Sequence, residues 1–129
     1  MNRAFLPAEC PLELELPLIE GSIPAGFPSP AADYVQARID LNRRLVHDKA
    51  ATIMIRATGD SMKDAGIQDG SVLVVNSARP PVHFDIVVVQ VDGEHTVKRL
   101  HRVEGRLELH PDNASGQYPV IQVSHELRI

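Results

Sequence analysis

Ser61 lies in a segment whose residue types and spacing fit acyl-transfer chemistry. The segment, Gly59-Asp-Ser-Met-Lys-Asp-Ala-Gly66, separates two apolar runs that have the character of strands. A serine at a sharp strand exit that opens a short helical turn projects its hydroxyl and leaves nearby backbone N–H groups unpaired. Such N–H groups, here around Asp60, Ser61 and Met62, stabilise a developing oxyanion. The segment therefore predicts a serine nucleophile with backbone oxyanion support.

A serine nucleophile needs a base, and Lys98 is the best candidate in the chain. It lies in Thr96-Val-Lys-Arg-Leu100, where strand alternation places it on the same face as Thr96 and Leu100. Partial burial there lowers the pKa of the amine, and a neutral amine can accept the serine proton. Most strand lysines are structural or solvated. It is the combination with the serine segment that favours a Ser–Lys dyad.

Metal and redox chemistry are weakly supported. The six histidines form no close ligand motif, and the single cysteine, Cys10, rules out an internal disulfide. We therefore predict neither a metal nor a cofactor.

The composition is that of a soluble protein with one domain. The 129 residues are 43% hydrophobic and 23% charged, and no apolar run approaches the roughly 20 residues of a membrane span. The first 20 residues lack the pattern of a secretory signal, so we expect a cytoplasmic protein without a membrane partner. The net charge of −4 argues against strong direct binding of DNA, which needs a broad basic surface.

The elements that position the two candidate residues follow from local pattern. Residues 1–32 hold six prolines, which excludes a regular helix and predicts an extended arm. One helix is predicted over 33–46, because Asp33 and Gln36 have capping-box spacing and Val35, Ile39 and Val46 recur on one face.

Beyond residue 46 the pattern is that of strands. Runs rich in β-branched residues predict six of them, at 52–57, 72–75, 85–91, 95–103, 106–110 and 120–123. Asp92-Gly93 and Glu104-Gly105 are tight-turn signals between such runs, so the strands from 85 to 110 should form an antiparallel meander. The expected fold is mainly β, with one short helix in a domain at 33–129 and an extended N-terminal arm.

Seven segments together resemble one known family. They are Gly26-Phe-Pro-Ser-Pro-Ala-Ala-Asp-Tyr-Val35, Ile39-Asp-Leu-Asn42, Gly59-Asp-Ser-Met62, Gly66-Ile67, Asp69-Gly70, Val91-Asp-Gly-Glu94 and Thr96-Val-Lys-Arg-Leu100. The chain resembles UmuD-type proteins of the LexA/UmuD family of self-cleaving Ser/Lys peptidases. The resemblance implies a LexA/UmuD-like antiparallel β peptidase domain, with Ser61 as nucleophile and Lys98 as general base.

The resemblance also implies a substrate and partners. The bond that is cut would be Ala25–Gly26, two small residues between Pro24 and Pro28 in an arm that can enter a narrow cleft as an extended strand. A RecA filament on single-stranded DNA would promote the cut in the SOS response. The trimmed homodimer would then join a Y-family DNA polymerase for translesion synthesis.

Three departures from the family pattern bear on this expectation. Phe84 replaces a usual glycine and loses easy access to positive φ, and Ser71 replaces a common acidic residue. The sequence ends at Leu127-Arg-Ile129, about where relatives continue into a last apolar strand, so we expect that strand to be missing and a sheet edge to stay unpaired.

Competing functions differ in what they require. A LexA-like repressor needs a helix-turn-helix before the cleavage bond, which 25 proline-rich residues do not form, and a leader peptidase normally needs a membrane anchor. The alternative left open is a non-catalytic polymerase-binding module that retains the peptidase fold.

Overall fold

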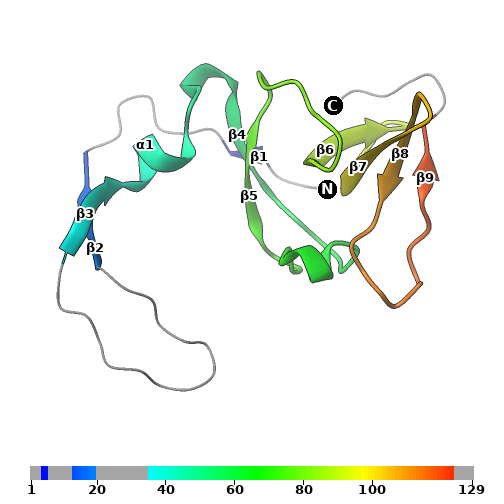
Figure 1. The fold of residues 1–129 in the computed structure, drawn as a ribbon, viewed down its shortest axis with the longest axis horizontal. Helices are drawn as coiled ribbons and strands as arrows, with labels where there is room; N and C mark the ends of the chain where they lie inside the picture. Colours follow the sequence, from blue (N-terminus) through cyan, green and yellow to red (C-terminus); the bar gives the residue numbers. More distant parts are fainter. Residues whose placement is uncertain (1–3, 6–12, 20–34, 124–129) are drawn as a thin grey trace.

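A computed structural model describes residues 4–5, 13–19 and 35–123 of the chain (Figure 1). Its strands are β1 (Ala4–Phe5), β2 (Glu15–Ile19), β3 (Val35–Asp40), β4 (Thr52–Arg56), β5 (Val72–Asn76), β6 (Ile86–Val91), β7 (Glu94–Val103), β8 (Arg106–His110) and β9 (Ile121–Gln122). One α-helix, α1 (Leu41–Leu45), and two 3-10 turns, η1 (Lys49–Ala51) and η2 (Lys63–Ala65), complete the described elements. The expectation of a mainly β fold with one short helix is confirmed.

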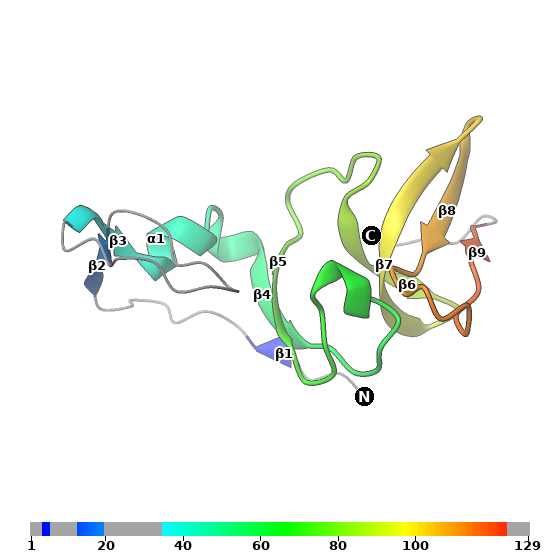
Figure 2. The ribbon, with the colours of Figure 1, turned by 60° about the horizontal axis from the view of Figure 1, so that its bottom comes forward.

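The described strands form three antiparallel sheets. Their orders are β1-β4-β5, β2-β3 and β6-β7-β8-β9. Figures 1 and 2 both place the β6–β9 sheet at one end, the β2–β3 ribbon with α1 at the other, and β4 and β5 between them. The six strands predicted after residue 46 are present, with ends that differ by at most one residue.

The β6–β9 sheet is a meander because its turns match the twist of its strands. Asp92 and Gly93 have φ of 49° and 82°, and Glu104 and Gly105 have φ of 48° and 78°. Two successive positive φ values are those of a type I′ hairpin turn, which the right-handed twist of strands favours. The predicted meander is confirmed.

One face of this sheet carries the hydrophobic core. Val87 and Val89 of β6, Leu100 of β7 and Leu109 of β8 pack together and are at most 7% exposed. The register pairs Val87 with Lys98 and Leu100 with Leu109, so Lys98 lies on the core face. Strand alternation therefore buries a lysine side chain among apolar ones.

The prediction of a helix over 33–46 is wrong for most of its length. Residues 35–40 form β3, which pairs with β2 in a register that places Ile39 opposite Leu16. The helix begins only at Leu41, because the Asp40 side chain accepts a hydrogen bond from the Asn42 N–H at 2.9 Å and caps it. The spacing of the apolar residues fits both a helix and a strand. Pairing with β2, which is distant in sequence, makes residues 35–40 a strand.

The expected arm contributes two of these strands. β1 pairs with β4, and β2 pairs with β3, so the described parts of residues 1–32 are extended. The predicted boundary between arm and domain at residue 33 lies outside the described residues, as does the chain end at 124–129, so these predictions stay untested.

Phe84 adopts the backbone conformation expected of the glycine that it replaces. It adopts φ of 71°, a left-handed conformation that is uncommon for a residue with a bulky side chain. Its N–H still donates to the Leu100 carbonyl at 2.8 Å, and the residue is 55% exposed. The turn before β6 therefore keeps the conformation of a glycine turn with a phenylalanine in place.

Candidate active site

Ser61 lies in the connection between β4 and β5, directly before the η2 turn. The connection is braced by Gly59, which has φ of 83° and whose N–H donates to the Asp69 carboxylate at 2.8 Å. Met62 follows as the N-cap of η2, and its side chain is 1% exposed. The buried Met62 anchors the turn, while the half-buried Ser61 faces Lys98 of β7; Figure 2 shows this green turn in the connection between β4 and β5.

Lys98 of β7 meets Ser61 across a sequence separation of 37 residues. Its Nζ lies 2.9 Å from Ser61 Oγ, 2.9 Å from Thr96 Oγ1 and 3.1 Å from the Val97 carbonyl oxygen. The Lys98 residue is 7% exposed. The structure therefore brings together the two residues that the sequence analysis chose for the dyad.

The environment of Lys98 favours the neutral amine. Burial lowers the pKa of Lys98 below its ordinary value, because removing water penalises the charged form. No carboxylate among the described residues forms an ion pair with Lys98 to offset that effect. Lys98 is thus easier to deprotonate than a lysine in water.

The hydrogen-bond geometry fits both protonation states of Lys98. As an ammonium, Nζ donates to Ser61, Thr96 and the Val97 carbonyl. After loss of one proton, two N–H bonds remain for Thr96 and Val97, and the lone pair is left to accept the Ser61 hydroxyl proton. Two fixed partners therefore aim the basic lone pair at Ser61.

The backbone around Ser61 has N–H groups available for an incoming oxygen. Those of Asp60, Ser61 and Met62 have no hydrogen-bond acceptor within the described part of the chain, whereas the Lys63 N–H donates to the Asp60 carbonyl at 3.1 Å. These are the amides that the sequence analysis proposed as oxyanion support. Their position at the start of a helical turn suits that role.

A loop after β8, at residues 112–114, contacts the turn that carries Ser61, called the serine turn below (residues 59–66). The sequence analysis did not single out this loop. The Asp64 N–H donates to the Asp112 carbonyl at 2.8 Å, and the Asp64 carboxylate accepts from the Ala114 N–H at 2.7 Å. The Asp112 N–H points to the sulfur of Met62 at 3.4 Å. These partners lie about 50 residues apart in sequence, so no local pattern indicates the contact.

Arg99 follows Lys98 directly but has different surroundings. Its guanidinium pairs with the Asp112 carboxylate at 2.7 Å and donates to the Phe84 carbonyl at 2.7 Å. Arg99 therefore links the β6 entry turn to the loop that braces the serine turn, and it does so from the other face of β7.

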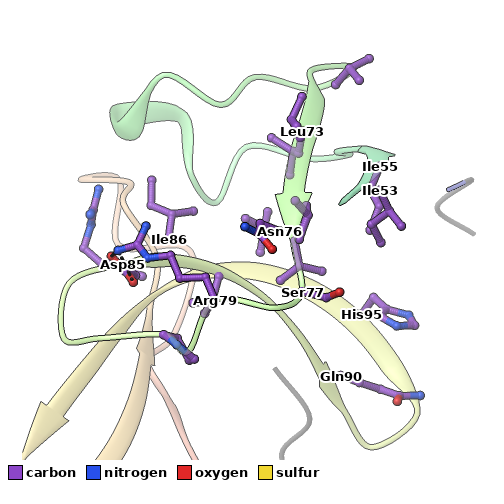
Figure 3. A pocket seen from close by; sticks show the side chains of 18 of the residues that line it. Ile53, Ile55, Leu73, Asn76, Ser77, Arg79, Asp85, Ile86, Gln90 and His95 are labelled. Carbon is purple, nitrogen blue, oxygen red and sulfur yellow. Dashed lines mark hydrogen bonds and ion pairs between the residues drawn. The ribbon is translucent and has the colours of Figure 1, made fainter. Parts of the chain in front are cut away.

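An open groove of about 860 Å³ lies on this second face, between β5 and the β6–β7 hairpin. Figure 3 shows Leu73 and Asn76 of β5 near it, with Ile86 at the start of β6. The residues that line the groove include Arg99 and exclude Ser61 and Lys98. The groove is therefore separate from the candidate active site.

The other predicted features are partly outside the described residues. Ala25 and Gly26, the proposed cleavage site, lie there, so their relation to Ser61 is not described. Within the described ranges, no group of three or more His, Cys, Asp or Glu side chains is placed to hold a metal ion. No helix in the same ranges is long and apolar enough to cross a membrane.

Comparison with known proteins identifies the family. The Peptidase S24-like family model matches residues 17–129. The chain belongs to the Peptidase S24-like family. Within the family it is a UmuD-type member of the LexA/UmuD group, as the resemblance predicted.

Relatives of this S24-like chain include both UmuD-like proteins and repressors. It is 44% identical to Protein SamA of Salmonella typhimurium over 115 residues, 89% of this chain and 80% of SamA. It is 51% identical to Protein ImpA of Escherichia coli over 84 residues, 65% of this chain and 58% of ImpA. It is 38% identical to the LexA repressor of Delftia acidovorans over 121 residues, 94% of this chain and 52% of the repressor. The match thus spans less than two thirds of ImpA and about half of the repressor. Together with the family match, these relatives make the S24-like chain a UmuD-like SOS mutagenesis protein.

Proposed function

We propose that this chain is a self-cleaving serine endopeptidase that cuts its own Ala25–Gly26 bond in the SOS response. Ser61 is the nucleophile and Lys98 the general base. The observation that carries the proposal is the 2.9 Å contact between Lys98 Nζ and Ser61 Oγ at a lysine that is 7% exposed. A buried lysine on a serine hydroxyl is an arrangement that can carry out acyl transfer without a histidine.

The first half of the reaction breaks the peptide bond. Neutral Lys98 takes the proton of Ser61 as Oγ attacks the Ala25 carbonyl carbon, and the resulting oxyanion lies against the Ser61 and Met62 N–H groups. The intermediate collapses with loss of the Gly26 nitrogen, which takes the proton from Lys98. Ser61 is then esterified by Ala25.

The second half restores the serine. Lys98, again neutral, accepts a proton from water as that water attacks the ester carbonyl carbon. The new intermediate collapses to the Ala25 carboxylic acid as Lys98 returns the proton to Ser61 Oγ. The products are residues 1–25 and 26–129, and the carboxylic acid then ionises.

β7 offers the arm a place to bind. Its pairing with β8 covers residues 99–103, whereas residues 94–98 pair with β6 alone among the described strands. The edge beside Lys98 is therefore not covered by another described strand and can pair with an extended segment. A proline-rich segment with small residues at its centre suits such an edge, because it is already extended.

The trimmed chain would act as a homodimer and an accessory subunit of a Y-family translesion polymerase, with a RecA filament on single-stranded DNA promoting the cut. Similarity to SamA and ImpA supports the SOS setting. The net charge of −4 supports contact with DNA through these partners rather than directly.

Intact mass spectrometry tests the proposal. Purified chain is incubated near pH 10, where a lysine is increasingly neutral, and separately at neutral pH with a RecA filament on single-stranded DNA. Fragments that end at Ala25 and start at Gly26 are expected from the wild type and absent from the Ser61→Ala and Lys98→Ala variants. A folded wild type that stays whole under both conditions, yet binds a translesion polymerase, would instead establish the non-catalytic binding module.

A further inference from the structure

Asn113 spans the space between the loop after β8 and the serine turn. Its side-chain Nδ2 donates to the Asp60 carbonyl oxygen at 2.7 Å, across 53 residues of sequence. Its Oδ1 accepts from the Ser115 N–H at 2.9 Å, which fixes the amide from its own loop. Both ends of the carboxamide are thus occupied, and the amino end reaches the residue before Ser61.

The carbonyl that Asn113 holds belongs to the same peptide unit as the Ser61 N–H. The described chain contains no cis peptide bond, and in a planar trans peptide the C=O and N–H point in opposite directions. Drawing the Asp60 oxygen toward Asn113 therefore turns the Ser61 N–H the other way. That N–H is one of the amides without an acceptor in the described part of the chain.

We propose that Asn113 is a positioning residue, which orients the Asp60–Ser61 peptide so that the Ser61 N–H faces the oxyanion of the self-cleavage reaction. The inference rests on the proposed function above. Asn113 acts through the Asp60–Ser61 peptide, whose carbonyl oxygen it holds.

Two features set the size of the effect. The Lys63 N–H also donates to the Asp60 oxygen, at the longer distance of 3.1 Å, so loss of Asn113 loosens the peptide without freeing it. The Asp64 N–H, which donates to the Asp112 carbonyl, and the Asp64 carboxylate, which accepts from the Ala114 N–H, hold the two loops together independently. Loss of the Asn113 amino group therefore lowers the cleavage rate more than it lowers stability.

The variant Asn113→Asp removes the donor and keeps an oxygen for the Ser115 N–H. Asn113→Ala removes the donor without adding a charge. Asn76→Asp is a matched control, because Asn76 accepts from Ala78 N–H at 2.9 Å in a similar turn but lines the groove on the other face of β7. All three are made in the full chain.

The readout is the first-order rate of self-cleavage between pH 7 and 11, with the melting temperature measured alongside. Both Asn113 variants should lower the self-cleavage rate on its high-pH plateau by about 10- to 100-fold. This loss is smaller than, or comparable to, the loss caused by removing an oxyanion donor. In Asn113→Ala, which adds no charge, the midpoint of the profile, which reports Lys98, should stay in place, and Asn76→Asp should behave as the wild type. A plateau equal to that of the wild type, or a loss explained by a shifted midpoint, would overturn the proposal.

A second measurement is independent of cleavage. In the Lys98→Ala chain, the ¹³C shift of the Asp60 carbonyl and the ¹⁵N shift of Ser61 should both move when Asn113→Ala is added, and unchanged shifts would also overturn the proposal. The two failures are distinguishable. A Ser61→Ala chain that still cleaves defeats the proposed function, whereas a Ser61-dependent cut that ignores Asn113 defeats only the positioning role.

Discussion

The two faces of β7 place neighbouring basic residues in opposite environments. Lys98 lies on the core face beside Leu100, hydrogen-bonds Ser61 and has no carboxylate partner among the described residues. Arg99 lies on the groove face and pairs with Asp112. A one-residue step along the strand thus separates a cation whose pKa is lowered by burial from a cation that is paired with a carboxylate.

The residue types suit these two environments. A lysine amine loses its proton readily when it is buried, whereas a guanidinium stays protonated in proteins and forms a planar, forked contact with a carboxylate. The comparison teaches that the chemistry of β7 depends on which face each cation occupies. Exchanging residue types between the faces is therefore the sharpest way to test it.

The largest effect is expected from Lys98→Arg. It keeps the positive charge but removes the ability to accept a proton, so the self-cleavage rate should fall by at least about a hundredfold. Arg99→Lys is the matched control and should cleave within a few-fold of the wild type. Rates come from intact mass over time, and a Lys98→Arg chain that cleaves normally would mean that Lys98 is not the base.

A smaller loss of rate is expected from Thr96→Val. This change keeps the shape but removes the oxygen that holds Nζ at 2.9 Å, so the lone pair of Lys98 is less well aimed at Ser61. We expect cleavage about tenfold slower at high pH. Thr96→Ser restores the hydroxyl and should recover most of the rate; if it is as slow as Thr96→Val, side-chain packing is responsible instead.

Lys98→Met should raise stability at neutral pH by about 1 kcal/mol, because an apolar chain of similar volume replaces a buried ammonium, partly offset by lost hydrogen bonds. The pKa of Lys98 is lowered in the folded state. In the pH range between this lowered pKa and the ordinary 10.5, the unfolded state therefore binds more protons than the folded state. Wild-type stability therefore rises with pH in that window.

Urea unfolding of the Lys98 and Lys98→Met chains at several pH values checks this predicted pH dependence of stability. The advantage of Lys98→Met should be largest at neutral pH and shrink as the pH rises toward 10.5. A difference that is constant with pH would show that Lys98 titrates alike in both states. Both proteins carry Ser61→Ala, so that neither cleaves itself and the two differ only at residue 98.

The smallest effect is expected from Asp112→Asn on the groove face. The pair with Arg99 is partly exposed, so its loss should cost about 0.5–1 kcal/mol of unfolding free energy, and less at high salt. The backbone contact between Asp112 and Asp64 remains, so the cleavage rate should stay within about twofold. A large loss of rate would show that the two faces are coupled through this pair.

Much of the fold was predictable because its signals are local. Alternation predicted which side chains of β7 share a face, and the Asp-Gly and Glu-Gly pairs predicted tight turns, at which the structure has positive φ at both positions. The prediction of a helix over 33–46 failed because Val35 and Ile39 fit one face of a helix and one face of a strand equally well. β2 supplies the pairing that makes residues 35–40 a strand, and no window around those residues contains it.

The sequence by itself determined the candidates for chemistry: a serine at a strand exit, and a lysine on the apolar face of a later strand. Only the tertiary structure decided that they meet, with 2.9 Å between Nζ and Oγ, that Thr96 and Val97 orient the amine, and that Asn113 reaches the peptide before Ser61. The reason is physical. Residue type and alternation are properties of neighbouring positions, whereas contacts across 37 or 53 residues depend on how the serine turn and the loop after β8 pack against the meander.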